Sequence, residues 1–205
     1  ITSCSPGWVK YCENHYPEQL GHLSTAKSPQ AMFGAMVKTY YPQTDGIDPA
    51  SIYSVSVMPC TAKKYEAARP ELCDSGYRDV DAVITVREVA RMIKQAGIDF
   101  VNLPDEECDA PMALGTGAAT IFGTTGGVME AALRTVYEVV TGKTLPRLEL
   151  EDVRGTMGEI KEATIDLDGT PVKVAVANTL ARAKEIMEEV KAGTADYTFI
   201  EIMAF

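Results

Sequence analysis

The residues with the clearest chemical potential are a cysteine and a lysine, Cys60 and Lys63, in the segment Met58–Glu66 (MPCTAKKYE). A thiolate binds iron or zinc, and an ammonium group three residues later donates hydrogen bonds to an anion beside such a metal. The same residues have an ordinary interpretation, because a lone cysteine at a strand end is often a small buried hydrophobe and a lysine is usually solvated. The residue types alone leave both interpretations open.

A second thiol, Cys4, lies among turn-forming residues directly before a helix predicted over residues 6–18. Ser5 is predicted to cap this helix, with Pro6 in its first turn. A thiol before a helix N-terminus has its thiolate favoured by the helix dipole, which suits a ligand or a proton-exchanging group. A buried thiol in a tight loop explains Cys4 equally well.

Glycines crowd residues 115–127, before a helix predicted over 128–141. Such a loop can hold phosphate or another anion at a helix N-terminus. The segment matches neither the GxGxxG fingerprint after a strand nor the phosphate loop that ends in Lys-Ser/Thr. Close packing of helices also explains the glycines, so anion or nucleotide binding is kept as one hypothesis among others.

The elements that position these residues alternate between strands and helices. Residues 24–30 carry a capping signal for a helix predicted over 30–41, with Met32, Met36 and Val37 on its apolar face. The apolar run at 52–58 predicts a buried strand that delivers Cys60 to its carboxyl end, where open α/β sheets bind ligands. A helix that begins near Thr61 and a strand over 82–86 complete one βαβ-like unit, and a helix over 86–96, closed by Gly97, follows it.

The C-terminal third continues this α/β pattern. Strands are predicted over 160–167, 172–177 and 197–203, with a turn at Asp168-Gly169 and a helix over 179–192 that ends at Gly193. The long stretch from 99 to 117 is predicted to be irregular and, by its length, functional or mobile.

Composition bounds the class of protein. The 205 residues are 46% hydrophobic and 23% charged, which is typical of a globular protein. A net charge of -10 argues against a nucleic-acid partner, and the lack of an apolar run of 18 residues argues against a membrane span.

Five cysteines without a CxxC pair, and no signal peptide, predict a cytoplasmic protein with reduced thiols. Two histidines make a His-rich zinc site or a Cys-His nucleophile improbable. A first residue other than methionine and a last residue directly after a strand-like run predict a fragment, an engineered product or an incomplete subunit.

Three segments together resemble the catalytic domain of iron-only (diiron) hydrogenases. Thr2–Trp8 resembles the family's first motif, Thr-Ser-Cys-Cys-Pro-x-Trp, and Met58–Glu66 fits its second, Met-Pro-Cys-x-x-Lys-x-x-Glu. Glu201–Ala204 begins the third. Residues 27–30 and 122–135 are also similar to family sequence, and the resemblance covers essentially the whole chain.

The resemblance implies an α/β fold with two lobes, about residues 1–110 and 111–205. Each lobe would hold a mostly parallel four-stranded sheet flanked by helices, with the active-site cleft between them. The implied cofactor is the H-cluster, a 4Fe-4S cubane bridged by a cysteine to a diiron subcluster. The implied reaction is the reversible reduction of protons to H2 in hydrogen metabolism.

The resemblance also implies residue roles. Cys60 would bind the cubane, Lys63 would hold a cyanide of the diiron unit, and Cys4 would exchange a proton with its bridgehead amine. Ser24 would lie on the proton relay that leads away. The residues expected to line the diiron pocket are Ser28, Pro29, Gln30, Met58, Phe122 and Met203.

The sequence departs from the family at ligand positions. Ser5 stands where the first motif has a second cysteine, and Phe205 stands where the third has a ligating one, so Cys60 alone remains of four expected thiolates. The implied partners are ferredoxin or other electron-transfer subunits, together with flanking segments or another chain that completes the site. The alternative function is a non-catalytic homologue that serves as a structural, sensory or electron-transfer-complex subunit.

Overall fold

The computed structural model describes residues 1–112, 115–145 and 159–204. The chain divides into two compact units, the first made of Ile1–Ala26 with Gly115–Phe205 and the second of Lys27–Leu114. The division predicted near residue 110 lies close to the observed boundary between Leu114 and Gly115. The prediction grouped residues 1–26 with the segment that follows them, but in the structure they belong to the first unit, where Thr2 pairs with Glu201 in a parallel bridge.

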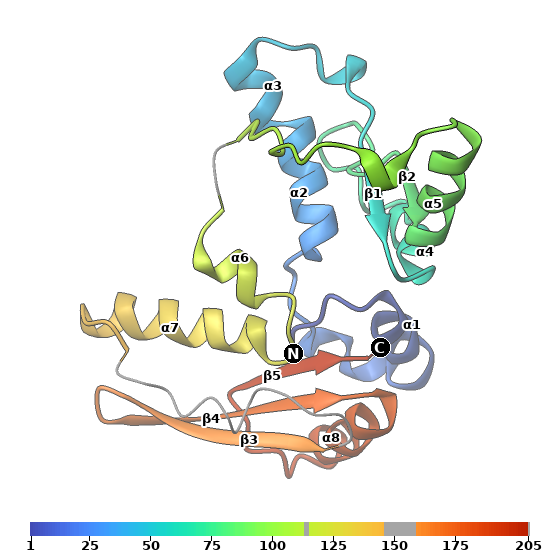
Figure 1. Ribbon diagram of the computed structural model, residues 1–205. Coiled ribbons are helices and arrows are strands. Elements are labelled where there is room, and N and C mark those ends of the chain that lie inside the picture. The colour runs from blue at the N-terminus through green and yellow to red at the C-terminus, as the bar shows by residue number, and fades with distance from the viewer. Residues whose placement is uncertain (113–114, 146–158, 205) are drawn as a thin grey trace. The chain divides into compact units, whose positions relative to one another are not determined.

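The helices and strands follow one another in a mixed order along the chain (Figure 1). The helices are α1 (Pro6–His15), α2 (Pro29–Lys38), α3 (Tyr40–Asp45), α4 (Ala62–Ala67), α5 (Val86–Gln95), α6 (Gly117–Ile121), α7 (Gly127–Thr141) and α8 (Leu180–Ala192). The strands are β1 (Val55–Met58), β2 (Ala82–Thr85), β3 (Ile160–Leu167), β4 (Thr170–Asn178) and β5 (Phe199–Met203), and 3-10 turns occupy Pro17–His22, Pro49–Ser51 and Phe100–Asn102. Within the described residues, no helix has both the length and the apolar character needed to span a membrane.

The sheet of the first unit has the order β3-β4-β5 and is mixed. β4 and β5 are parallel, but β3 and β4 are antiparallel over eight residue pairs. The turn at Asp168-Gly169 has positive φ at both residues, 52° and 90°, as two-residue hairpins require. Such a short turn can join only antiparallel strands, so the prediction of a mostly parallel sheet is wrong here. The predicted four strands per lobe also exceed the two and three found among the described residues.

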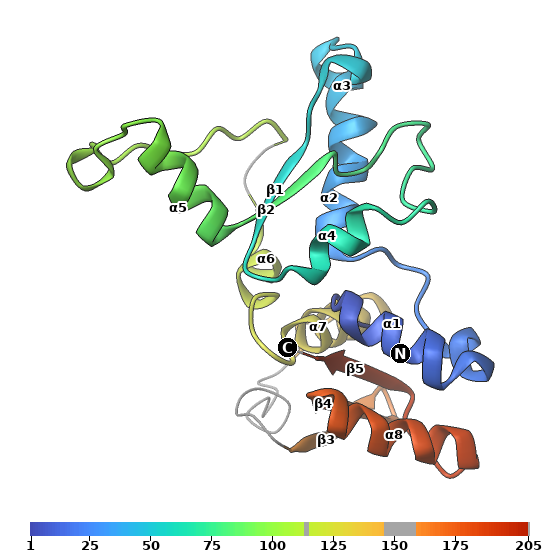
Figure 2. The ribbon, with the colours of Figure 1, turned by 90° about the vertical axis from the view of Figure 1, so that its right-hand side faces the viewer.

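Alternating side chains of β4 divide the core of the first unit into two layers. Ala175 and Ala177 pack with α1 and α8, around Trp8 and Ile186. The valines of β4 point to the other face, where α7 supplies Met129 and Leu133. Figures 1 and 2 show α7 and α8 on opposite faces of the sheet. The first unit is therefore a three-layer α/β/α sandwich.

The second unit is built on the parallel pair β1 and β2, with Val55 opposite Ala82. This confirms the predicted βαβ-like unit, and Figures 1 and 2 show α2 and α5 on opposite sides of the two strands. The prediction that β1 is buried is wrong, because Val55 and Val57 are 49% and 50% exposed. Among the described residues β1 pairs with β2 alone, and its side chains line an open groove toward α2.

The predicted helix over 30–41 is two helices, α2 and α3, that separate at Thr39. Met32 and Met36 are exposed, so the predicted apolar face is not the buried one. Instead Gly34 lies so close to the backbone of Asp79 that a Cβ at this position would overlap its carbonyl oxygen. Lys38 is buried and forms an ion pair with Asp81 at 2.7 Å. These two long-range contacts determine which face of α2 packs inward.

Candidate functional site

Cys60 lies in the short bend between β1 and α4 and is half-buried. The strand ends because Pro59 has no N–H to donate to a sheet ladder. The helix begins directly afterwards, with the Lys63 N–H donating to the carbonyl of Cys60 at 3.4 Å. The second motif therefore folds as predicted, with a strand that delivers a thiol and a helical turn that places a lysine near it.

The Lys63 ammonium forms a buried ion pair with Glu66 in the same helix. Its Nζ lies 3.1 Å from Glu66 Oε1 and 3.0 Å from Oε2, and the two residues are 6% and 7% exposed. Buried charges are tolerated when they are paired and hydrogen-bonded. The lysine and the glutamate of the second motif thus form one neutral unit inside the protein.

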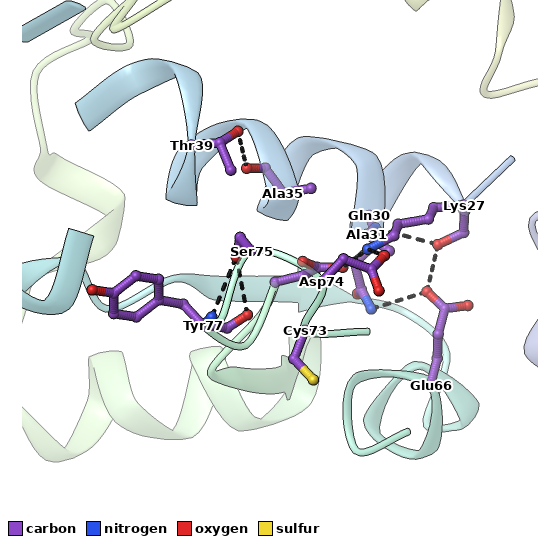
Figure 3. A network of polar contacts seen from close by, with 12 residues as sticks. Lys27, Gln30, Ala31, Ala35, Thr39, Glu66, Cys73, Asp74, Ser75 and Tyr77 are labelled. Carbon is purple, nitrogen blue, oxygen red and sulfur yellow. Dashed lines mark hydrogen bonds and ion pairs between the residues drawn. The ribbon is translucent and has the colours of Figure 1, made fainter. Parts of the chain in front are cut away.

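Glu66 also accepts hydrogen bonds from the start of α2. The Ser28 hydroxyl donates to Oε1 at 2.5 Å and the Gln30 side-chain amide donates at 3.3 Å, as seen for Gln30 and Glu66 in Figure 3. The side-chain amide oxygen of Gln30, Oε1, in turn accepts from the Ser56 hydroxyl of β1 at 2.8 Å. The structure thus brings Ser28, Gln30 and Lys63 together on a single carboxylate.

Ser28 has two functions in this network, and its local sequence explains them. It is the N-cap of α2, where its hydroxyl oxygen accepts from the Ala31 N–H at 3.3 Å, and Pro29 follows at the first helical position. Its hydroxyl hydrogen is directed to Glu66. The predicted capping signal is confirmed, and the cap links α2 to α4.

Pro29, Gln30 and Met58 come together along a groove of about 390 Å³ between α2 and β1. Phe33 of α2 and residues 54–57 of β1 also line it. Consecutive strand residues line one groove only when it follows the edge of the strand, since alternate side chains point to opposite faces. The six predicted site residues of the second unit therefore lie around α2, β1 and α4.

In the first unit, the Cys4 thiol contacts the Met203 thioether, with 3.6 Å between the two sulfur atoms. Cys4 is half-buried and Met203 is buried at the end of β5. The contact follows from strand pairing, because the Thr2 N–H donates to the Ile200 carbonyl and the Ile202 N–H donates to the Thr2 carbonyl. The first and third sequence motifs therefore run side by side.

Ser5 is buried at the start of α1. The prediction that its side chain caps this helix is wrong, because the hydroxyl forms no hydrogen bond with the first turn. Its hydroxyl instead accepts from the Ala204 N–H at 3.4 Å. Strand pairing at Thr2 has placed Ser5 beside the end of β5, so its hydroxyl bonds a distant partner in preference to the helix. Phe205, where the family has a ligating cysteine, lies outside the described residues.

Sequence reasoning assigned no function to the buried carboxyl group of Glu201 in β5. It is 1% exposed and accepts from the backbone N–H groups of Gly126 at 3.1 Å and Met129 at 2.6 Å. Burial raises the pKa of this carboxyl group, while the two N–H donors act in the opposite direction. A glutamate inside the apolar run Phe199–Met203 was the available signal. The acceptor at the N-terminus of α7 is thus the chain's own carboxyl group.

The other two predicted residues of the first unit are placed as follows. Phe122 is half-buried at the C-terminal end of α6, where its N–H donates to the Ala118 carbonyl. Ser24 is exposed, with its hydroxyl oxygen accepting from the Ala26 N–H and its own N–H donating to the Ile1 carbonyl. A relay through Ser24 stays a prediction.

A cubane needs four thiolate ligands or close substitutes, and this donor set does not supply them. Cys12 is packed in the core around Trp8, and Cys73 and Cys108 are exposed. Within residues 1–112, 115–145 and 159–204, no group of three histidine, cysteine or acidic side chains is arranged to hold a metal ion. The described residues therefore do not fit a complete cluster.

Comparison with known proteins gives a family match over nearly the whole chain. The profile described as "Iron only hydrogenase large subunit, C-terminal domain" matches residues 1–204. The periplasmic Fe hydrogenase large subunit of Nitratidesulfovibrio vulgaris is 57% identical over 204 residues, which are 100% of this chain and 48% of the relative. The NADP-reducing hydrogenase subunit HndD of Solidesulfovibrio fructosivorans is 52% identical and is covered over 34% of its length.

A more distant relative and the solved structures agree with this match. Cytosolic iron-sulfur assembly component 3 of Pongo abelii is 33% identical over 100% of this chain and 44% of its own length. The apo form of FeFe-hydrogenase HydA1 from Chlamydomonas reinhardtii, variant C377H, has a TM-score of 0.79 and 44% identity, over 99% of this chain and 58% of that chain. The chain thus spans about half the length, or less, of these curated relatives. Because their names include periplasmic and cytosolic forms, the predicted cytoplasmic location stays a prediction.

Proposed function

Because the chain belongs to the iron-only hydrogenase family, as a homologue of the C-terminal domain of its large subunit, we propose that it forms part of an H-cluster domain that interconverts protons and H2. The reaction joins two protons and two electrons into one H2 molecule, and it runs in reverse when H2 is oxidised. The observation that carries the proposal is the complete second motif, folded with Cys60 after the end of β1 and with the buried Lys63 in the helix α4 that follows.

The proposed roles fall to residues of both units. In the second unit Cys60 is a ligand of the cubane, and Lys63, with Ser28, Pro29, Gln30 and Met58, surrounds the diiron subcluster. The network on Glu66 supports this role, because it fixes the side chains of Ser28, Gln30 and Lys63 without leaving a buried charge unbalanced. In the first unit, Phe122 and Met203 also have proposed roles in binding the diiron subcluster. Cys4 exchanges protons, as a thiol at the edge of a water-poor site can do.

The remaining ligands and the electrons come, in this proposal, from outside the 205 residues. Polypeptide on either side of the matched segment, or another chain, supplies the thiolates that Ser5 and Phe205 do not. Relatives two to three times longer than the matched segment support this part of the proposal. Ferredoxin or a nicotinamide-linked subunit delivers the electrons, and the relative named NADP-reducing hydrogenase makes the second source reasonable.

One observation favours a second candidate, a homologue without hydrogenase activity that acts as a structural, sensory or electron-transfer-complex subunit. Ser5 occupies a family ligand position and is engaged by the Ala204 N–H within the protein. In addition, a relative at 33% identity is named as an iron-sulfur assembly component and not as a hydrogenase.

Grafting separates the two candidates. Residues 1–204 replace the matching segment of the Nitratidesulfovibrio vulgaris subunit, with either Ser5 or S5C, and each graft is matured anaerobically and assayed for iron and by electron paramagnetic resonance. We expect the S5C graft to bind a cubane and its C60A variant to lose it. A folded S5C graft that binds no iron would rule out the hydrogenase function. A Ser5 graft that binds iron and evolves H2 would support the first candidate, whereas activity in the S5C graft alone would support the second and assign the loss to that single position.

A further inference from the structure

Glu201 connects three segments that are distant in sequence. Its side chain reaches from β5 to the N-terminus of α7, 72–75 residues earlier in the chain, and bonds the N–H groups of Gly126 and Met129. Its backbone pairs with Thr2 in a parallel bridge. Glu201 is itself part of the third motif. It therefore links this motif to the first motif and to the glycine-rich corner, residues 122–127, between α6 and α7.

The glycine-rich corner needs a partner of this kind. The N-cap of α7 is Gly126, with φ 79° and no side chain to accept from the first N–H groups of the helix. Uncapped helix N–H groups inside a protein are costly, and they favour an anionic acceptor. Gly127 allows the close approach to α6, because a Cβ there would overlap the carbonyl oxygen of Ile121. Glu201 thus performs the capping that the local sequence does not provide.

The same contacts fix the register of the predicted site residues. Cys4 follows Thr2 by two residues and Met203 follows Glu201 by two, so the parallel bridge brings the two sulfur atoms to 3.6 Å. Phe122 lies on the corner that the Glu201 side chain holds. We propose that Glu201 is a positioning residue that fixes the Cys4 thiol and the Met203 thioether relative to the Phe122 corner. Its importance for hydrogen chemistry rests on the proposed function, but its geometry can be tested without any cluster.

The test measures how accessible the two sulfur atoms are in the iron-free 205-residue chain. Met203 oxidation by hydrogen peroxide and Cys4 alkylation by iodoacetamide are mapped by mass spectrometry, with exposed Met92 and Cys108 as internal references. E201A removes both acceptor oxygens. E201Q keeps the shape of the side chain but places an N–H donor against one of the two backbone donors. We expect E201A to raise both normalised rates at least about tenfold, and E201Q to raise them in the same direction by less.

L133A is the matched control, because it removes buried side chain from α7 without touching the Glu201 contacts. All variants are compared at the same interval below their own unfolding midpoints, so a general loss of stability affects them equally. We expect L133A to leave the Cys4 and Met203 rates within about twofold of the wild type. Equal rates in E201A, E201Q and L133A would show that Glu201 is only one more structural contact. If E201A does not fold, the comparison of E201Q with L133A decides. These rates are measured on the iron-free chain, so they do not depend on whether the hydrogenase graft binds iron. The proposal for Glu201 and the proposed function can therefore be refuted independently.

Discussion

Replacing Glu66 by glutamine removes the charge that faces the Lys63 ammonium while keeping the size of the side chain. The side chains of Lys63 and Glu66 are 7% and 9% exposed, so solvent screens the pair little. Removing one partner of a buried ion pair costs about 3–5 kcal/mol. Because glutamine keeps one oxygen to accept from the Ser28 hydroxyl, we expect the lower end, about 3 kcal/mol. The pair lies in the second unit, Lys27–Leu114, and in a unit of that size this loss lowers the unfolding midpoint by about 12–24 °C.

The assay is thermal and urea unfolding followed by circular dichroism at pH 7, on E66Q, K63M and the double variant. We expect the double variant to be less destabilised than the sum of the single ones by about 1–3 kcal/mol, because the two groups stabilise each other. E185Q is the matched control. Its carboxylate pairs with Arg182 at 2.6 Å, three residues away in one helix like the Lys63–Glu66 pair, but the side chains of Arg182 and Glu185 are 40% and 50% exposed, and surface pairs contribute little. If E66Q lowers the midpoint no more than E185Q does, the argument that a buried charge network holds the second motif is wrong.

Three further predictions concern other parts of the chain. G127A should destabilise the protein by about 1–3 kcal/mol in urea unfolding, because its Cβ meets backbone, whereas G123A, with ordinary contacts only, should be neutral or slightly stabilising. Hydrogen bonds from Lys64 and from the start of α5 lower the pKa of Glu88 to about 2, so its stabilisation is complete above its ordinary pKa of 4.5 and disappears as the pH falls toward 2. E88Q should therefore flatten the acid side of the stability profile, and an unchanged profile would contradict this. Burial raises the pKa of Glu201, so its contribution is complete below 4.5 and decreases as the pH rises through the raised value. The stability of the wild type relative to E201Q should fall between pH 4 and pH 8, and a rise would show that the two N–H donors outweigh burial.

Local sequence signals predicted much of the fold. β3 has the predicted bounds, and α7 and α8 begin within one residue of theirs. Ser28 lies inside the predicted capping signal and caps α2, and positive φ at Gly97 and Gly193 marks the predicted helix ends. Each of these features depends on neighbours a few residues away, such as a cap, a turn or an apolar period.

Features that depend on distant partners could not be predicted in the same way. The inward face of α2 depends on Asp79 and Asp81, some 40 residues later, and not on its own methionines. The open edge of β1 depends on which strands lie beside it. The wrong prediction for β3 and β4 has another cause. The turn between these strands was predicted correctly, but the antiparallel direction that such a turn requires was not inferred from it.

The candidate site divides in the same way. The motif spacing indicated Cys60 and Lys63, and the family resemblance indicated Ser28. Neither indicated that Glu66 would join them, since that requires α2 and α4 to pack together. Glu201 was part of a recognised motif and still had no assigned function. Its partners, the N–H groups at the start of α7, carry no side-chain signal in the sequence.

The most direct test of the hydrogenase assignment is the rate of H2 evolution from reduced methyl viologen by the S5C graft of residues 1–204 in the Nitratidesulfovibrio vulgaris subunit. We predict activity within about tenfold of the unaltered subunit, since the two sequences are 57% identical over the graft, and none above background in the same graft with C60A. A folded S5C graft without H2 evolution, or one whose activity survives C60A, would contradict the account.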